Sequence, residues 1–181
     1  MNSTQNTYHA GLASVLFALA LALLSGCTAI PSGVKPVNDF DVERYLGQWY
    51  EIARFDHSFE RGLSKVTAQY TRREDGGIDV TNRGFDGASK TWEEAKGRAY
   101  FVDSPTVGHL KVSFFGPFYA SYVIMALDKD GYQYSLVTGP NRDYLWILAR
   151  APSLSAEMTN QLITYAEQQG YDTSRLIWVQ Q

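Results

Sequence analysis

Hydrophobic and polar positions alternate in short runs over most of the chain, and clusters of turn residues separate these runs. Alternation with a period of two residues is typical of β-strands that have one buried and one exposed face. Turn clusters such as Asp86-Gly87 and Asp130-Gly131 favour hairpins between neighbouring runs. Short strands at regular spacing favour an antiparallel sandwich or barrel. The pattern predicts eight strands, at residues 48–55, 63–72, 78–85, 90–102, 109–114, 119–127, 132–138 and 144–149.

The hydrophobic period changes after Pro152, where one helical face becomes mostly apolar. Ser155 is a suitable N-cap and Gly170 a suitable C′ residue, so a helix is expected between them. A last short strand is expected at residues 175–179. This order contains no βαβ alternation and favours an all-β domain with one docked C-terminal helix. The positions on the helical face are Met158, Leu162, Tyr165, Ala166 and Gln169.

The first part of the chain differs from the rest. Residues 1–26 contain no Asp, Glu, Lys or Arg, and the fourteen residues Gly11–Leu24 are almost entirely apolar. A helix of that length spans roughly 21 Å, which is less than the ~30 Å hydrocarbon core, so a signal peptide is favoured over a transmembrane helix. Residues 28–38 contain two prolines and a glycine without periodicity and predict a flexible tether. The folded domain is then expected at residues 39–181.

Composition excludes several classes of function. The net charge of −3 offers no basic field for nucleic acid. Cys27 is the only cysteine, which rules out an internal disulfide and a cysteine-rich metal site. His57 and His109 lie near predicted strand ends and are expected to be solvated, and no metal or cofactor is expected. The Glu93-Glu94 pair points to opposite faces of a strand, and no nucleophile elbow is present. Catalysis is therefore disfavoured.

The stretch Leu24-Ser25-Gly26-Cys27 resembles the lipobox of bacterial lipoproteins. The resemblance implies that the sulfur of Cys27 receives a diacylglyceryl group, that the peptide is cut before Cys27, and that the new amino group is acylated. Three acyl chains would anchor the protein firmly in a membrane. In enterobacterial-type sorting an Asp at the next position favours the inner membrane. Thr28 therefore implies the outer membrane, facing the periplasm, with membrane lipid as partner.

Gly47-Gln48-Trp49 at the first strand and Arg150 after the eighth resemble the signature of the lipocalins. The resemblance implies an eight-stranded antiparallel up-and-down barrel, with one C-terminal helix and a short final strand. In that family the tryptophan closes one end of the barrel and the arginine packs across it. Three further segments are similar to the bacterial outer-membrane lipocalins, namely GPNRDYLWILAR (Gly139–Arg150), FFGPFYASY (Phe114–Tyr122) and LIWVQQ (Leu176–Gln181).

Strand alternation predicts which side chains face the interior of such a barrel. If Arg150 faces inward, Leu148, Trp146 and Tyr144 share its side. Alternation from Trp49 carries Glu51, Ala53 and Phe55 inward. In the sixth strand either Tyr122, Ile124 and Ala126 or Ser121, Val123 and Met125 face inward, and the first set is favoured. The expected ligand-binding residues are Trp146, Tyr144, Tyr122, Phe114, Phe55, Tyr100 and Phe85.

An eight-stranded barrel can hold one small ligand, and aromatic walls suit an acyl chain with one polar end. The leading hypothesis is a binding module, not an enzyme, for a fatty acid or a lysophospholipid. The resemblance implies storage or transport of lipid in envelope maintenance under stress. Two alternatives are an enzyme on the same scaffold that acts on a lipophilic substrate, and an interaction protein whose barrel is packed solid. The FFGPFYASY segment could form a homodimer surface as easily as a rim.

Overall fold

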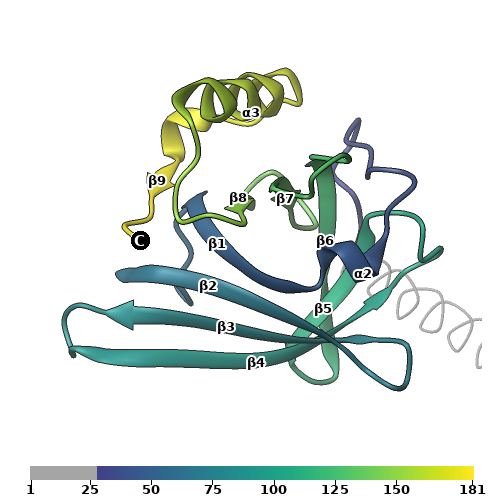
Figure 1. The fold of residues 1–181 in the computed structure, drawn as a ribbon, viewed down its shortest axis with the longest axis horizontal. Helices are drawn as coiled ribbons and strands as arrows, with labels where there is room; N and C mark the ends of the chain where they lie inside the picture. Colours follow the sequence, from purple (N-terminus) through teal and green to yellow (C-terminus); the bar gives the residue numbers. More distant parts are fainter. Residues whose placement is uncertain (1–27) are drawn as a thin grey trace, which may run out of the picture.

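The computed structural model describes residues 28–181, so the expected signal peptide and Cys27 lie outside the described residues. Eight antiparallel strands follow one another around a closed barrel, and a ninth short strand lies beside the first (Figure 1). This confirms the predicted barrel, and each strand boundary lies within two residues of its expected place. The strands are β1 (Gly47–Arg54), β2 (Leu63–Arg72), β3 (Ile78–Asp86), β4 (Thr91–Phe101), β5 (His109–Phe115), β6 (Phe118–Leu127), β7 (Tyr134–Thr138), β8 (Leu145–Ala149) and β9 (Ile177–Trp178).

Because successive strands are antiparallel, their connections alternate between the two ends of the barrel. The closed end holds the β2–β3, β4–β5 and β6–β7 connections and the short helix α2 (Val42–Tyr45), which the sequence pattern did not predict. The Arg44 guanidinium of α2 donates to the carbonyls of Lys129 (3.0 Å) and Asp130 (2.6 Å) in the β6–β7 connection. The other four connections form the open end.

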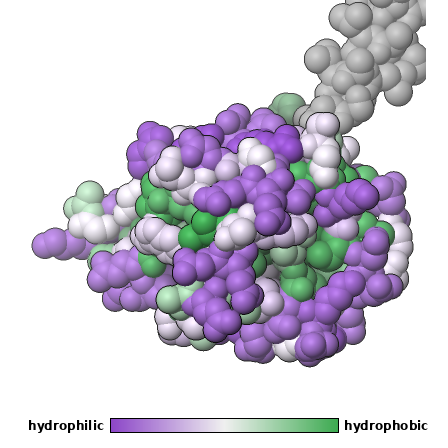
Figure 2. All heavy atoms as spheres, turned by 90° about the horizontal axis from the view of Figure 1, so that it is seen from above, coloured by the Kyte–Doolittle hydropathy of each residue, from purple (hydrophilic) through white to green (hydrophobic). Residues whose placement is uncertain are grey.

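Alternate strand residues build two separate cores. The inner core fills the barrel, and the outer core lies between the barrel wall and helix α3 (Ala156–Gln168), which covers one side of the barrel (Figure 1). Seen from the α3 side, hydrophilic residues cover most of the surface and apolar residues show in patches between them (Figure 2). The described residues supply both faces of each core, so residues 28–181 form a self-contained folding unit.

Strand residues supply most members of the two cores, and α2, α3 and the connections supply the rest. The inner core consists of Phe40, Tyr45, Trp49, Tyr70, Ile78, Val80, Ala99, Leu110, Ile124, Tyr132, Val137 and Leu148. The outer core consists of Val34, Ile52, Ala53, Phe55, Val123, Met125, Leu136, Leu145, Ile147, Ala149, Leu162, Ala166 and Tyr171.

The expected tether is in fact part of the folded domain. Val34 is buried in the outer core. The Val37 amide donates to the carbonyl of Ile124 (2.9 Å), and the Val37 carbonyl accepts from the amide of Gly108 (2.8 Å). The Arg142 guanidinium donates to the carbonyl of Ser32 (2.7 Å). The prediction of a flexible tether over residues 28–38 is therefore wrong for residues 32–37. Proline and glycine prevent periodic structure in this segment, but they do not prevent it from packing on the barrel.

The C-terminal residues complete the barrel wall. Helix α3 begins after Ser155, whose hydroxyl accepts from the Met158 amide, and ends before Gly170 at a φ of +83°, as predicted. After the 3-10 turn η2 (Thr173–Arg175), β9 pairs with β1. The Gln181 side-chain amide donates to the carbonyls of Glu51 (2.6 Å) and Val66 (3.0 Å), which joins β1 to β2 where the two strands no longer pair. Within residues 28–181, no helix has both the length and the apolar character needed to cross a membrane.

Trp49 and Arg150 lie at the closed end of the barrel, as the family signature implies. The Trp49 ring is fully buried, and its indole N–H donates to the carbonyl of Tyr45 (2.8 Å). The Arg150 guanidinium carbon lies 4.0 Å from the centre of the Trp49 ring. Gly47 takes a φ of +92°, and a Cβ at this position would lie 3.3 Å from the guanidinium. A side chain at position 47 would therefore be strained and would press on Arg150.

Trp49→Ala should lower the free energy of unfolding by about 3–5 kcal/mol, the range for a large buried aromatic side chain. Trp178→Ala is the matched control because Trp178 is 53% exposed, and its effect should stay within about 0.5 kcal/mol. Urea denaturation followed by circular dichroism measures both. Equal effects of the two substitutions would contradict the role of Trp49 at the closed end.

Candidate ligand-binding site in the barrel

The inner face of the barrel is lined by alternate residues of the strands. In β8, Trp146 and Leu148 lie on the same side as Arg150 and join the inner core. In β6, Tyr122 and Ile124 lie on the inner face. Ala126, which was expected beside them, lies on the outer face because β6 changes register against β7 between Ile124 and Ala126. Phe114 of β5 lies on the inner face with Leu110 and Val112.

Phe55 does not line the barrel, which corrects the prediction from alternation. The pairing of β1 with β8 shifts register between Glu51 and Ala53. Such a bulge adds one residue to a strand and reverses the faces that follow it. Glu51 and Arg54 are therefore both buried in a cluster at the barrel wall, while Phe55 packs in the outer core, with its ring 6.4 Å from that of Tyr171.

Tyr100 and Phe85 also lie outside the barrel. The pairing of β3 with β4 is continuous, so alternation places Ala99 and Phe101 inside and Tyr100 outside. The Tyr100 hydroxyl donates to the carboxylate of Asp75 (3.1 Å). Phe85 shares the outer face with its cross-strand neighbour Trp92, and their ring centres are 5.5 Å apart. The prediction that Tyr100 and Phe85 line the barrel is wrong, because aromatic character does not determine which face of a strand is buried.

Three tyrosine hydroxyls meet inside the barrel, near Trp49 and the closed end. The Tyr122 hydroxyl lies 2.8 Å from that of Tyr45 and 2.9 Å from that of Tyr70. The Tyr45 hydroxyl also donates to Ser135 (3.2 Å). Burial raises the pKa of Tyr45 to about 12, so this group is neutral at physiological pH. The three tyrosine hydroxyls therefore form a neutral cluster that is hydrogen-bonded within itself.

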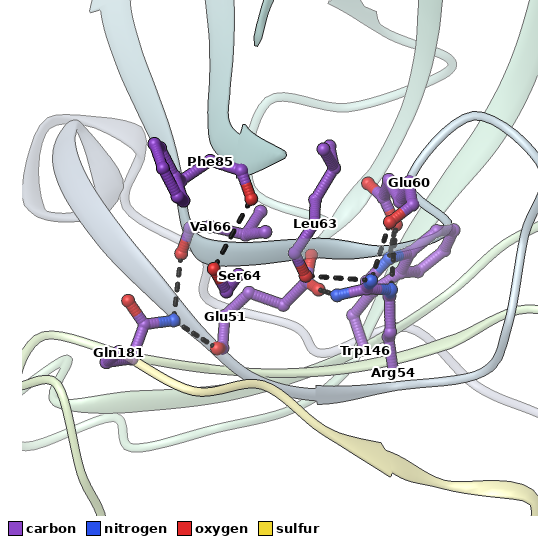
Figure 3. Close-up of polar contacts among 9 residues, drawn as sticks. All are labelled: Glu51, Arg54, Glu60, Leu63, Ser64, Val66, Phe85, Trp146 and Gln181. Atoms are coloured by element: carbon purple, nitrogen blue, oxygen red, sulfur yellow. Dashed lines mark hydrogen bonds and ion pairs between the residues drawn. The ribbon is translucent and has the colours of Figure 1, made fainter. Parts of the chain in front are cut away.

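A buried charged cluster lies nearer the open end (Figure 3). Figure 3 shows Glu51 and Glu60 pointing toward Arg54. The Arg54 guanidinium donates to the carboxylate of Glu51 (2.6 Å) and to the backbone carbonyl of Glu60 (2.6 Å). The Glu60 carboxylate accepts from the indole N–H of Trp146 (3.2 Å). We call these three charged residues, Glu51, Arg54 and Glu60, the acid–arginine cluster.

The acid–arginine cluster contains two carboxyl groups and one guanidinium, all buried. Burial, and next the charge of Glu60, raise the pKa of Glu51 to about 8. Burial also raises the pKa of Glu60, while the indole of Trp146 and the charge of Arg54 act against it. Glu51 is therefore protonated at neutral pH. Two buried carboxyl groups thus share one guanidinium, and the raised pKa of Glu51 reduces the negative charge of the cluster.

Aromatic rings stack at the open end above the cluster. The His57 ring lies 4.4 Å from that of Tyr144 and 5.3 Å from that of Phe59, nearly parallel to both. Tyr144 stacks in turn on Trp146, with ring centres 5.9 Å apart. Burial lowers the pKa of His57, so the imidazole is neutral at physiological pH. Tyr144 and Trp146, both expected from the sequence, thus form one aromatic stack at the mouth of the barrel.

Both histidines are less solvated than expected. His57 is partly buried in the aromatic stack, and His109 is only 5% exposed. The Nε2 atom of His109 lies 3.2 Å from the hydroxyl of Ser121. Ser121 is also buried, and both residues alternate with inner-face residues of their strands, so they lie on the outer face away from the barrel interior.

Sequence reasoning missed Arg54, Glu60, Tyr45 and Tyr70 as residues of the interior. The bulge in β1 reverses the face on which Arg54 lies, so alternation did not predict its burial. Glu60 lies in the β1–β2 connection, where no periodicity predicts burial. Tyr45 belongs to α2, a helix of only four residues. Tyr70 could have been found, since it alternates with Ala68 and Val66 in β2. A charged residue in a strand gives no signal of its own that it is buried.

Comparison with known proteins agrees with this geometry. Residues 40–181 match the lipocalin-like domain family. The chain belongs to this family. It is 53% identical to the outer membrane lipoprotein Blc of Vibrio cholerae over 168 residues, which cover 93% of this chain and 98% of the relative. It is 52% identical to the protein of the same name from Escherichia coli, with 92% and 95% covered.

More distant relatives share the fold. Temperature-induced lipocalin-1 of Arabidopsis thaliana is 36% identical, with 79% of this chain and 80% of the relative covered. Insecticyanin from the tobacco hornworm Manduca sexta has a TM-score of 0.66 at 21% identity and covers 84% of this lipocalin and 87% of its own chain. The allergen Per a 4 from cockroaches has the same TM-score and identity, with 85% and 96% covered.

Glu51→Gln should make the lipocalin more stable at high pH. The pKa of Glu51 is higher in the folded protein than in the unfolded chain, so the folded state binds the extra proton. Wild-type stability should therefore be fully present below about pH 4.5 and fall as the pH rises toward 8. At pH 8.5 the variant should melt about 3–8 °C above the wild type.

Differential scanning calorimetry from pH 5 to 9 measures this difference. Glu94→Gln is the matched control, because Glu94 is exposed on β4 and its one ion pair among residues 28–181 is with Lys96. Parallel pH profiles of Glu51→Gln and wild type would contradict the raised pKa of Glu51.

Proposed function

We propose that this lipocalin is an outer-membrane lipoprotein that binds a fatty acid or a lysophospholipid in its barrel. It stores or transports lipid in envelope maintenance under stress, and it acts as a binding module, not an enzyme. Its relatives at 52–53% identity carry the name outer membrane lipoprotein, which supports the membrane assignment. We further propose that Cys27 carries the acyl anchor and that the barrel faces the periplasm.

The observation that carries the binding proposal is the polarity gradient along the inner face. Toward the closed end, apolar side chains surround tyrosine hydroxyls that are bonded to one another. The acid–arginine cluster and the aromatic stack lie nearer the mouth. An acyl chain would extend toward Trp49, and its polar end would remain near Trp146 and Tyr144. Apolar walls with a few placed polar groups are typical of sites for such ligands.

Binding should be measured by isothermal titration calorimetry on residues 28–181, with oleate and with oleoyl lysophosphatidylethanolamine. Saturable binding at micromolar concentration or below is expected for at least one of them. Trp146→Ala should weaken the affinity at least tenfold, because Trp146 lines the mouth and bonds Glu60. Trp178→Ala is the matched control and should bind as the wild type does. The ratio of the two affinities then identifies the ligand class.

No saturable binding of either lipid, in a protein that melts cooperatively, would contradict the lipid-binding proposal. It would favour a barrel packed solid that acts in protein interaction. Loss of stability in Trp146→Ala without loss of affinity would show that Trp146 is a packing residue only. Turnover of a lipid by the purified protein would instead favour an enzyme.

Cys27→Ala should abolish acylation and remove the protein from the outer-membrane fraction. The reason is that the thiol is the attachment point for the diacylglyceryl group. Incorporation of labelled palmitate and fractionation on a density gradient measure the two effects. Normal recovery of Cys27→Ala in the outer membrane would contradict the anchor.

A further inference from the structure

The turn between β5 and β6 carries two highly exposed aromatic side chains. Phe115 is 83% exposed and Phe118 is 76% exposed, the highest values among the large apolar residues at 28–181. They pair across the turn, with Gly116 and Pro117 between them. We call Phe115–Phe118 the tip; it lies at the open end of the barrel, on the opposite side from α3 (Figure 1). Adjoining apolar side chains at such exposure indicate an interaction site.

Two cations without carboxylate partners lie beside the tip. A groove of about 460 Å³ runs next to it, lined in part by Arg98, Phe114, Pro117 and Tyr119. Arg98 forms no ion pair within the described residues, nor does Lys111, whose ammonium lies 5.4 Å from the centre of the Tyr119 ring. The other two cations that line the groove are already neutralised, because Arg73 pairs with Asp75 and Asp79, and Lys96 pairs with Glu94.

We propose that the tip docks on the surface of a bilayer that contains anionic phospholipid. Phe115 and Phe118 enter the boundary between head groups and acyl chains, while Arg98 and Lys111 contact the phosphates. Aromatic side chains next to basic ones are typical of surfaces that lie in the membrane interface. Anionic lipid attracts such cations at short range.

The shape and charge of this region favour a lipid surface over a second protein. The apolar side chains protrude from a two-residue turn and do not form a flat face. Lysine is depleted at protein interfaces, whereas here Lys111 of β5 forms no ion pair within the described residues. A bilayer accommodates both, because head groups and acyl chains meet within a few ångströms.

Docking at the tip would bring the mouth of the barrel to the lipid surface. The β5–β6 turn belongs to the same end of the barrel as the aromatic stack of His57 and Tyr144. A lipid could then pass between bilayer and barrel with little exposure to water. The proposal goes beyond ligand binding and does not depend on which lipid the barrel holds, since the tip and the two cations lie outside the inner core.

Vesicle flotation of residues 28–181 tests the docking surface. Wild type should float with vesicles of 70% phosphatidylethanolamine and 30% phosphatidylglycerol, and less with pure phosphatidylcholine. The double variant Phe115→Ser and Phe118→Ser should lower the partition coefficient at least tenfold. The double variant Arg98→Gln and Lys111→Gln should remove the preference for anionic vesicles. Wild-type binding should weaken as salt rises, because salt screens exposed charges.

Ile177→Ser with Trp178→Ser is the matched control, because these residues are 41% and 53% exposed on β9, away from the tip. It should float as the wild type does. Oleate binding and melting of every variant show that the barrel is intact, so a failure of docking is separable from a failure of ligand binding. Unchanged flotation of the tip variant would overturn the proposal. The proposal would also be overturned if the wild type sedimented as a dimer, did not bind vesicles, and became a monomer in the tip variant. That result would make the tip an interface between two copies of the chain.

Discussion

The contact between Arg150 and Trp49 is the interaction on which the closed end of the barrel depends. The guanidinium stacks on the indole and also donates to the carbonyls of Arg44 (2.7 Å), Leu46 (2.8 Å) and Gln48 (2.8 Å). The stacking contributes only about 0.5–2 kcal/mol. The greater consequence is that one side chain bonds three backbone carbonyls between α2 and the first residues of β1. Arg150 thereby joins the end of β8 to α2 and to β1.

Polar groups inside the barrel follow a second constraint, which is that buried charge must be balanced. Arg54 is 2% exposed and needs an anion. Its guanidinium donates to the Glu51 carboxylate and lies 3.8 Å from the Glu60 carboxylate, which accepts from Trp146. Burial, and next the charge of Glu60, raise the pKa of Glu51, because two buried carboxyl groups share one cation. This arrangement holds the β1–β2 connection against the mouth. It connects the stability of the barrel to the position of Trp146, which is also the central residue of the proposed ligand site.

The outer core covers only part of the outer surface of the barrel. Helix α3 and the segment around Val34 cover the outer faces of β6, β7 and β8, whereas the outer faces of β3 and β4 lack such a cover. Three exposed aromatic residues of the open end lie in this uncovered half, namely Trp92 and the two phenylalanines of the tip. The covered half stabilises the fold, and the uncovered half is available for interaction. Our docking proposal assigns the β5–β6 part of that surface to lipid.

The sequence by itself determined the strand order, the turns, the capped helix and the closed-end signature, because these depend on local periodicity and on residues such as Ser155, Gly47 and Trp49. It also placed Trp146 on the inner face through its alternation with Arg150. For β6 it left two sets open, and the favoured set contains Tyr122. Only the tertiary structure decided the positions of Phe55, Tyr100, Arg54 and Glu60. A bulge in β1 depends on pairing with β8, and the burial of a loop glutamate depends on a partner 86 residues away. Neither relation can be recognised in the local sequence, because both arise from contacts between distant parts of the chain.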